Sequence, residues 1–183
     1  MMQLTVLMLA SLPGLAAAAT AYVPPPALLA KARDPTDKCI LPGDFHVRDF
    51  AGISHDLGTT LSEYNFNYLS PATQVSTSCH FNASSKSTTH DWLTPRFSCQ
   101  NRDVKFIWQD EKKSLLMIER ACPDTKGVPA YEVSGSVSIS LSCAGMPGSG
   151  IPWRCVANQM DLVSNFTSIS LVLDPTVARR RLR

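Results

Sequence analysis

Three features that identify helical, membrane-spanning or motif-bearing proteins are missing from this chain of 183 residues. After the N-terminus, no stretch approaches the roughly 18 apolar residues that a transmembrane helix needs. No segment shows the apolar periodicity of an amphipathic helix, which argues against a helical fold. The patterns H-x-x-x-H, C-x-x-C and G-x-S-x-G are absent, so no local motif points to a metal, redox or hydrolase site.

Residues for acid–base or metal chemistry are also few, because the chain has only four histidines: His46, His55, His80 and His90. An aspartate follows His55 and His90, but neighbours on a strand point to opposite sides and do not form one local site. A triad assembled from distant positions is still compatible with the sequence. We expect no enzyme, no cofactor and no metal site. A metal bound by His80 and His90 is the weaker alternative to two loop histidines.

The N-terminus has the pattern of a secretory signal. Residues 1–15 carry no charged side chain, and a run of small residues, Ala16–Ala21, follows. An apolar core of about 10–12 residues before A-x-A is typical of a cleaved signal. We therefore assign residues 1–19 to a signal peptide and predict a secreted, extracellular protein. An even number of cysteines and two N-glycosylation sequons, at Asn82 and Asn165, agree with that compartment.

The excess of basic residues and a cluster of prolines lie in two segments outside the central part of the chain. Four of the 17 basic residues lie at 179–183, and without them 13 basic residues face 15 acidic ones. We treat 174–183 as a solvated or trimmed tail, with contact to phosphate or acidic surfaces as the alternative. Residues 20–44 contain Pro24-Pro25-Pro26 and are predicted to form an extended, loosely ordered leader. We expect no nucleic-acid partner and no membrane partner.

Period-two alternation dominates residues 45–173 and is clearest from Tyr131 to Cys143. In that run Val133, Val137 and Ile139 fall on one face, and serines fall on the other. Such alternation indicates a strand with one buried face and one solvated face. Further short runs give about nine or ten strands, including a hairpin over 104–120. The prediction is a single all-β domain, a compact antiparallel β-barrel or sandwich braced by disulfides.

The six cysteines allow fifteen pairings, and local spacing favours two bonds. Cys143 ends one strand and Cys155 begins the next, across a Gly/Pro-rich loop. Cys79 and Cys99 flank the polar segment 82–95 in the same way. Two more cysteines remain. Cys39 and Cys122 either pair with each other or leave thiols for another molecule.

The layout resembles the Alternaria major allergen-like family of small secreted fungal proteins. The residues that carry the resemblance are Val47-Arg48-Asp49-Phe50, Tyr64-Asn65-Phe66-Asn67, Ser78-Cys79, Ser98-Cys99, Phe106-Ile107-Trp108, Ser114-Leu115-Leu116, Cys143 and Cys155. The resemblance implies a β-barrel with two internal disulfides, here Cys79–Cys99 and Cys143–Cys155. It also implies a secreted allergen, effector or elicitor without enzymatic activity, which binds a host extracellular protein or a small ligand. Some members dimerise through a cysteine near the N-terminus, a position similar to Cys39, which makes a homodimer one expectation.

A second reading is a carbohydrate-binding or hydrolytic cell-wall protein. Trp92, Trp108 and Trp153 could offer a sugar-stacking face. Trp108 lies in an apolar hairpin, which favours the core, whereas Trp92 and Trp153 lie in predicted loops. Retention on cell-wall glycan would support this second reading over host binding.

Overall fold

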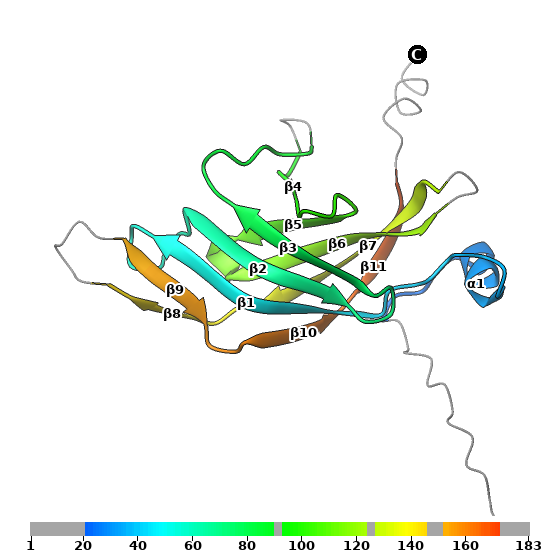
Figure 1. Ribbon diagram of the computed structural model, residues 1–183, viewed down its shortest axis with the longest axis horizontal. Helices are drawn as coiled ribbons and strands as arrows, with labels where there is room; N and C mark the ends of the chain where they lie inside the picture. The colour runs from blue at the N-terminus through cyan, green and yellow to red at the C-terminus, as the bar shows by residue number, and fades with distance from the viewer. Residues whose placement is uncertain (1–20, 90–92, 124–126, 146–151, 173–183) are drawn as a thin grey trace, which may run out of the picture.

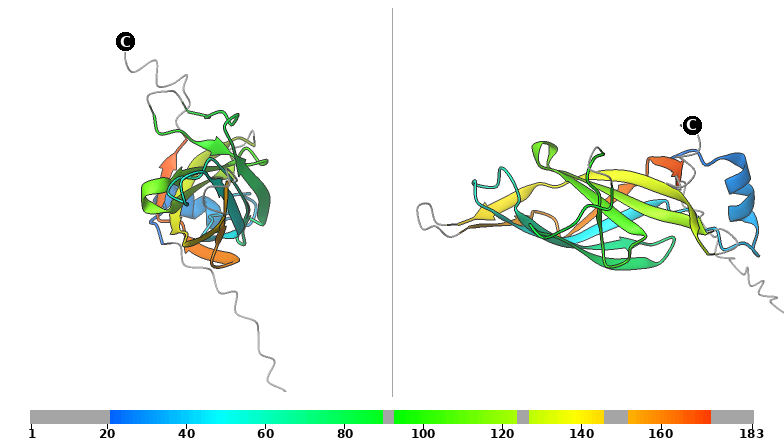
Figure 2. Two further views of the ribbon diagram at one scale, coloured as in Figure 1. Left: turned by 90° about the vertical axis from the view of Figure 1, so that its left-hand side faces the viewer. Right: turned by 90° about the horizontal axis from the view of Figure 1, so that it is seen from above.

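The protein is an antiparallel β-sandwich in this computed structural model, which describes residues 21–89, 93–123, 127–145 and 152–172. Two sheets face each other along a long, narrow body, with one helix at one end (Figures 1 and 2). The elements are α1 (Pro26–Arg33), β1 (Asp44–Ser54), β2 (Glu63–Ser70), β3 (Val75–Phe81), β4 (Phe97–Ser98), β5 (Val104–Gln109), the 3-10 helix η1 (Asp110–Lys112), β6 (Ser114–Pro123), β7 (Pro129–Ser138), β8 (Leu141–Ala144), β9 (Trp153–Ala157), β10 (Asp161–Asn165) and β11 (Ser168–Leu171).

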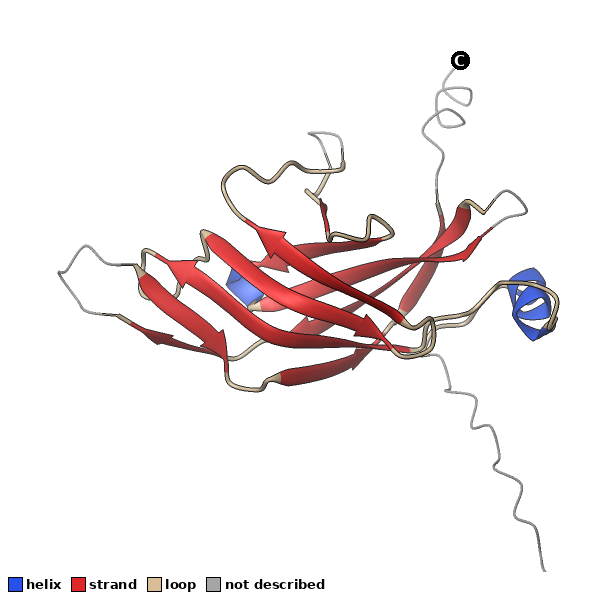
Figure 3. Ribbon diagram, in the orientation of Figure 1, coloured by secondary structure: helices blue, strands red, loops and turns tan. Residues whose placement is uncertain are grey.

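The first sheet has the order β3-β2-β1-β9-β8, and β10 also pairs with β1. The second sheet has the order β11-β7-β6-β5-β4. Strands dominate the described chain (Figure 3). The predicted all-β antiparallel class is therefore confirmed, with two sheets that are not closed into one barrel. Within the described ranges no helix is long and apolar enough to cross a membrane.

A bulge in β1 lets that strand pair with two different strands, β10 and β9, along the same edge. The register with β2 shifts between Arg48 and Ala51, and Asp49 has a positive φ of 55°. Before the bulge β1 pairs with β10, and after it with β9. The backbone N–H of Asp49 donates to the carbonyl of Met160, 3.0 Å away, in the turn between those two strands. The bulge thus fits its usual role of bending a strand and re-aiming its pairing.

The core between the sheets is rich in aromatic rings. Phe45, Phe50, Phe66, Phe106 and Phe166 are all buried. Phe50 and Phe66 stack with ring centroids 5.9 Å apart, and Phe66 meets Phe106 edge-on at 5.2 Å. Such ring pairs add specific geometry to a large apolar area removed from water.

The alternating run from Tyr131 to Cys143, predicted as one strand, is two. The chain leaves the second sheet after Ile139, whose N–H donates to the carbonyl of Lys113 at 2.8 Å. It enters the first sheet at Ser140, whose carbonyl accepts from the N–H of Asn158 at 2.9 Å. The two faces are as the alternation predicts, because Val133, Val137 and Ile139 are buried. The exposed serines on the opposite face are Ser136, Ser138, Ser140 and Ser142.

The leader differs from the prediction of a loosely ordered segment. The side chain of Leu28 in α1 is buried with Cys39, Ala121 and Cys122 in a small second core. Tyr22 is also buried, and its hydroxyl donates to the carbonyl of Pro42 at 2.8 Å. Proline at the first helical positions suits the start of α1. The leader therefore packs on the end of the sandwich (Figure 1).

Three disulfides hold the two ends and one side of the sandwich. They join Cys39 to Cys122, Cys79 to Cys99 and Cys143 to Cys155, the same pairs that the local spacing favours or leaves open. Cys143 and Cys155 are direct cross-strand partners in β8 and β9. Because Cys39 is bonded to Cys122, its thiol is not free for an intermolecular bond.

Candidate functional site

Residues 54–62 comprise the last residue of β1 and the loop to β2, and they lie at the end of the sandwich opposite α1 (Figure 1). Short polar side chains organise it from within. The Ser54 hydroxyl accepts from the N–H of Gly58 at 2.8 Å and donates to the Asp56 carboxylate at 2.8 Å. The same carboxylate accepts from the backbone N–H and the hydroxyl of Thr60, each at 2.7 Å. Asp and Ser bond to nearby backbone in this way when they shape turns.

The charge of Asp56 is part of that organisation. Hydrogen bonds from the backbone and hydroxyl of Thr60, followed by the bond from Ser54, lower the pKa of Asp56 to about 2. All these groups donate to the ionised carboxylate, which favours the charged form. Asp56 is therefore ionised at any physiological pH, and its charge strengthens the hydrogen bonds that it accepts within the loop.

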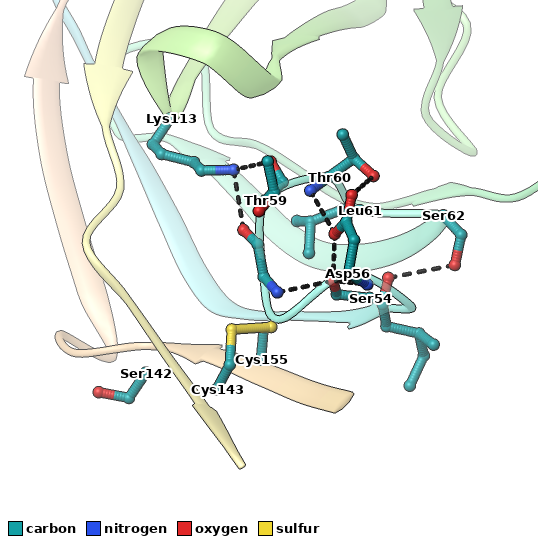
Figure 4. The surroundings of a disulfide bond; sticks show 12 residues. Ser54, Asp56, Thr59, Thr60, Leu61, Ser62, Lys113, Ser142, Cys143 and Cys155 are labelled. Atoms are coloured by element: carbon teal, nitrogen blue, oxygen red, sulfur yellow. Dashed lines mark hydrogen bonds between the residues drawn. A yellow bond between two sulfur atoms is a disulfide. The ribbon is translucent and has the colours of Figure 1, made fainter. Parts of the chain in front are cut away.

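Two side chains from the second sheet's side of the molecule, Lys113 and Asp110, also hold the same loop. The Lys113 ammonium donates to the carbonyl of Gly58 at 2.9 Å and also to that of Thr59 (Figure 4). The Asp110 carboxylate accepts from the N–H of Leu61 at 3.0 Å and from the indole N–H of Trp108 at 2.8 Å. Both anchors come from the turn between β5 and β6. The loop is thus tied to both sheets and is well placed to present a fixed surface.

A tight turn over Asp56–Thr59 forms the tip of the loop. The N–H of Thr59 donates to the carbonyl of Asp56 at 3.2 Å, and both central residues have positive φ, 60° at Leu57 and 86° at Gly58. Positive φ at both central positions is the requirement of a type I′ turn, for which Asn-Gly is the favoured pair.

Gly58 meets this requirement without strain, and its backbone lies against the Cys143–Cys155 bond. A Cβ at Gly58 would lie 2.6 Å from the Cys143 sulfur, closer than any ordinary contact. Figure 4 shows the disulfide between the loop and β8. A side chain at this position would therefore be strained for two separate reasons, φ and space.

Leu57 does not suit the turn, and this is the most unusual feature of the site. A left-handed conformation costs a branched L-residue about 1–2 kcal/mol. The Leu57 side chain is 69% exposed, so its burial in the core recovers little of that cost. Strained, exposed residues on an otherwise well-determined loop are typical of contact sites.

A surface groove of about 530 Å³ runs beside this leucine. Its lining comes from the loop tip, from the turn before β6, and from β8 and the residues just before it: Leu57, Gly58, Lys113, Ile139, Ser140, Leu141 and Cys143. Leu57 and Leu141 bring apolar side chains to the groove, and Lys113 and Ser140 bring polar ones. We refer to loop 54–62 and this groove together as the loop–groove surface. None of the sequence patterns predicted it, although Leu-Gly between short polar residues was the signal that could have.

A second polar cluster lies inside the sandwich, toward the α1 end. Glu119 of β6 is 1% exposed and accepts from the hydroxyls of Tyr68 and, at 2.6 Å, Thr73. Burial raises the pKa of Glu119, and it also raises that of Tyr68. Burial and the nearby Glu119 raise the pKa of Tyr22 to about 12. This cluster is enclosed by the leader and contributes to the core.

The histidines considered from the sequence are dispersed. His46 contacts Asp161 at 2.8 Å and His80 contacts Glu63 at 3.3 Å, on separate strands of the outer surface. His55 lies in the loop, exposed, and His90 lies outside the described residues. Among the described residues, no three His, Cys, Asp or Glu side chains are grouped to hold a metal ion.

Of the three tryptophans considered for a sugar-stacking face, two lie in the part of the chain that the structure describes. Trp108 packs in the core against Phe50, with centroids 5.2 Å apart. Trp153 is half-buried and starts β9, with its ring against the backbone of Gly145. Trp92 lies outside the described residues, as do the predicted signal peptide and the tail from 174.

The two sequons differ in their surroundings. The Asn82 side chain is half-buried, and its carbonyl oxygen accepts from the N–H and the hydroxyl of Ser84 at 2.9 and 2.7 Å. Asn165 is exposed at the end of β10, just before the buried Phe166. Glycosylation at either position stays a prediction.

Comparison with known proteins gives a distant likeness in three dimensions. No family model and no curated protein matches the chain. A crystal structure of the Alternaria alternata allergen Alt a 1 aligns with a TM-score of 0.48 at 17% identity, covering 79% of this chain and 98% of that one. A second crystal structure of the same allergen gives 0.46 at 19% identity, covering 72% and 94%. A similarity of this size assigns to this chain neither an activity nor a partner of the allergen, and membership of the allergen-like family stays a prediction.

Proposed function

We propose that this is a secreted, non-enzymatic protein that acts by binding an extracellular partner from a host, and that the loop–groove surface makes the contact. The single observation that carries the proposal is Leu57, an exposed leucine with positive φ on a loop braced from both sheets. Exposed apolar side chains on rigid supports bind with little loss of conformational entropy. Three disulfides suit an oxidising compartment.

The test makes the same substitution at two exposed leucines. Because Leu57→Asn also creates an N-glycosylation sequon with Gly58 and Thr59, all proteins are produced in bacteria, where sequons stay unmodified. Leu57→Asn removes the apolar side chain and creates Asn-Gly, the preferred pair for this turn, so the fold should be at least as stable. Leu171→Asn is the matched control, because Leu171 is 61% exposed on β11, where it pairs with Tyr131 near the α1 end.

The assay is affinity capture from plant apoplastic fluid with immobilised mature protein, read by mass spectrometry. We expect the wild type and Leu171→Asn to retain the same proteins and Leu57→Asn to lose them. The same retained set for all three proteins would contradict the proposal. A glycan array with the wild type and with Leu57→Asn runs in parallel. Strong glycan binding that does not respond to Leu57→Asn would favour the cell-wall reading instead.

A further inference from the structure

The backbone of β8 has hydrogen-bonding groups that are not used within the sheet. In the described part of the chain β8 is the last strand of its sheet and pairs only with β9. In an antiparallel pair, successive residues point their N–H and C=O alternately toward the partner and away from it. The carbonyl of Ser140 accepts from the N–H of Asn158, so the backbone N–H and C=O of Ser140 point toward β9. Two residues further along, Ser142 opposite Val156 does the same.

It follows that Leu141 and Cys143 point their N–H and C=O to the open side. The position of the disulfide agrees, because Cys143 and Cys155 have Cα atoms 4.0 Å apart. So short a separation fits a non-hydrogen-bonded pair, about 4.5 Å, and not a hydrogen-bonded one, about 5.5 Å. The open side of β8 therefore offers two donors and two acceptors in a row, at the spacing of a strand.

Those groups belong to residues that line the groove beside Leu57. Leu141 and Cys143 are both lining residues of the groove, and Leu57 and Gly58 line it from the loop. We propose that an extended peptide segment of the partner adds to β8 as a further antiparallel or parallel strand. This inference rests on the proposed function and names its mode of recognition. Main-chain bonds would give affinity, and alternate side chains would give specificity.

The groove also indicates the sequence type of that segment. On the inner face, the side chains of Leu141 and Cys143 are half-buried and Leu57 stands close to them. On the outer face, Ser140 and Ser142 are exposed. A strand beside β8 would place alternate residues on those two faces. The expected partner segment thus has about four or five residues, with apolar side chains at every second position.

A single segment fits this edge better than a second copy of the protein. A stable interface between two folded proteins buries about 1,200–2,000 Å². β8 has only four residues, and the groove has seven lining residues. We therefore commit to an extended peptide, and self-association becomes an outcome of the test.

The first experiment is amide hydrogen exchange on the free protein. We expect the Ser142 amide to exchange slowly, and the amides of Leu141 and Cys143 to exchange at least about tenfold faster. Similar protection at all three positions would mean that the edge is not open and would overturn the inference.

The second experiment uses a phage-displayed library of random nonapeptides as the probe. Enriched peptides are synthesised, and each backbone amide is N-methylated in turn. Strand addition predicts that methylation at alternate residues weakens binding by at least about tenfold each and that methylation between them has little effect. Bound peptide should also slow exchange at Leu141 and Cys143. Leu57→Asn should weaken binding, and Leu171→Asn should not.

The outcomes separate this inference from the proposed function. No enriched peptide, or binding without the alternating response to methylation, would overturn strand addition. If apoplastic capture still depends on Leu57 in that case, the binding function stands with a different mode of contact. A concentration-dependent dimer that protects Leu141 and Cys143 without any peptide would also overturn the inference, in favour of pairing between copies.

Discussion

Replacing Glu119 by glutamine should change how the stability of the protein depends on pH. Glu119 is buried between the sheets, and burial, as the largest cause, raises its pKa above the ordinary value of 4.5. The hydroxyls of Thr73 and Tyr68 oppose this increase by donating to the carboxylate, and Asp103 adds to it. In the folded protein the acid therefore holds its proton at pH values where the unfolded chain has released it.

The sign of the effect follows from proton linkage. Between pH 4.5 and the raised pKa, the folded state binds more protons than the unfolded state, so unfolding becomes easier as pH rises. The stability from this group is complete below about pH 4.5 and is lost as pH rises through the folded pKa. A tenfold difference in proton affinity between the two states corresponds to about 1.4 kcal/mol. Glutamine has a similar shape and no charge, so Glu119→Gln should flatten this part of the profile.

The assay is urea unfolding at pH 4, 5.5, 7 and 8, with the disulfides intact. Glu111→Gln on the exposed η1 is the control and should keep the wild-type profile. Glu119→Ala should be destabilised by about 2–4 kcal/mol at pH 4, because it leaves a cavity and two hydroxyls without an acceptor. Its difference from the wild type should narrow as pH rises, because alanine does not titrate. A Glu119→Gln profile as steep as that of the wild type would refute the reasoning.

Three further predictions concern packing. Gly135→Val should prevent stable folding, seen as loss of the cooperative melting transition, because a Cβ there would lie 2.9 Å from the Cα of Phe166 where the chain crosses between sheets. Ser136→Arg should change the free energy of unfolding by no more than about 0.5 kcal/mol, and so the melting temperature only slightly. Val137→Asp should unfold the protein, because it buries an unpaired charge. Equal melting temperatures for the two variants would show that the two faces are misassigned. Replacing both Cys39 and Cys122 by serine should lower the free energy of unfolding by up to about 4 kcal/mol and should expose α1 to trypsin. An unchanged rate of trypsin cleavage in α1 would contradict the docking of this helix through the disulfide.

Local pattern predicted most of the strands because each face repeats over a few neighbouring residues. The alternation of valine and serine after Tyr131 identifies the buried face without any knowledge of the partner strands. The pairing of Cys143 with Cys155 is favoured for the same local reason, since a short turn brings the ends of two successive strands together. The point where β7 ends and β8 begins was missed, because the pattern continues unchanged while the hydrogen-bond partners change from Lys113 to Asn158.

Contacts between distant segments decided the rest. The leader is proline-rich and looks unstructured, yet it packs because Leu28 meets Ala121 and Cys122, nearly a hundred positions away in the chain. Glu119 looks like a solvated residue in the sequence, and only the approach of Tyr68 from the other sheet makes it a buried acid.

The loop–groove surface likewise depends partly on local sequence pattern and partly on contacts between distant segments. The polar residues around Leu57 indicate a turn, but the open edge of β8, the disulfide beneath Gly58 and the anchor from Lys113 come from separate parts of the chain. By itself, the sequence determined the strand faces and the local cysteine pairs, because these depend on backbone periodicity. The tertiary structure decided which edge is open, which acid is buried and which leucine is exposed, because these depend on what distant segments cover.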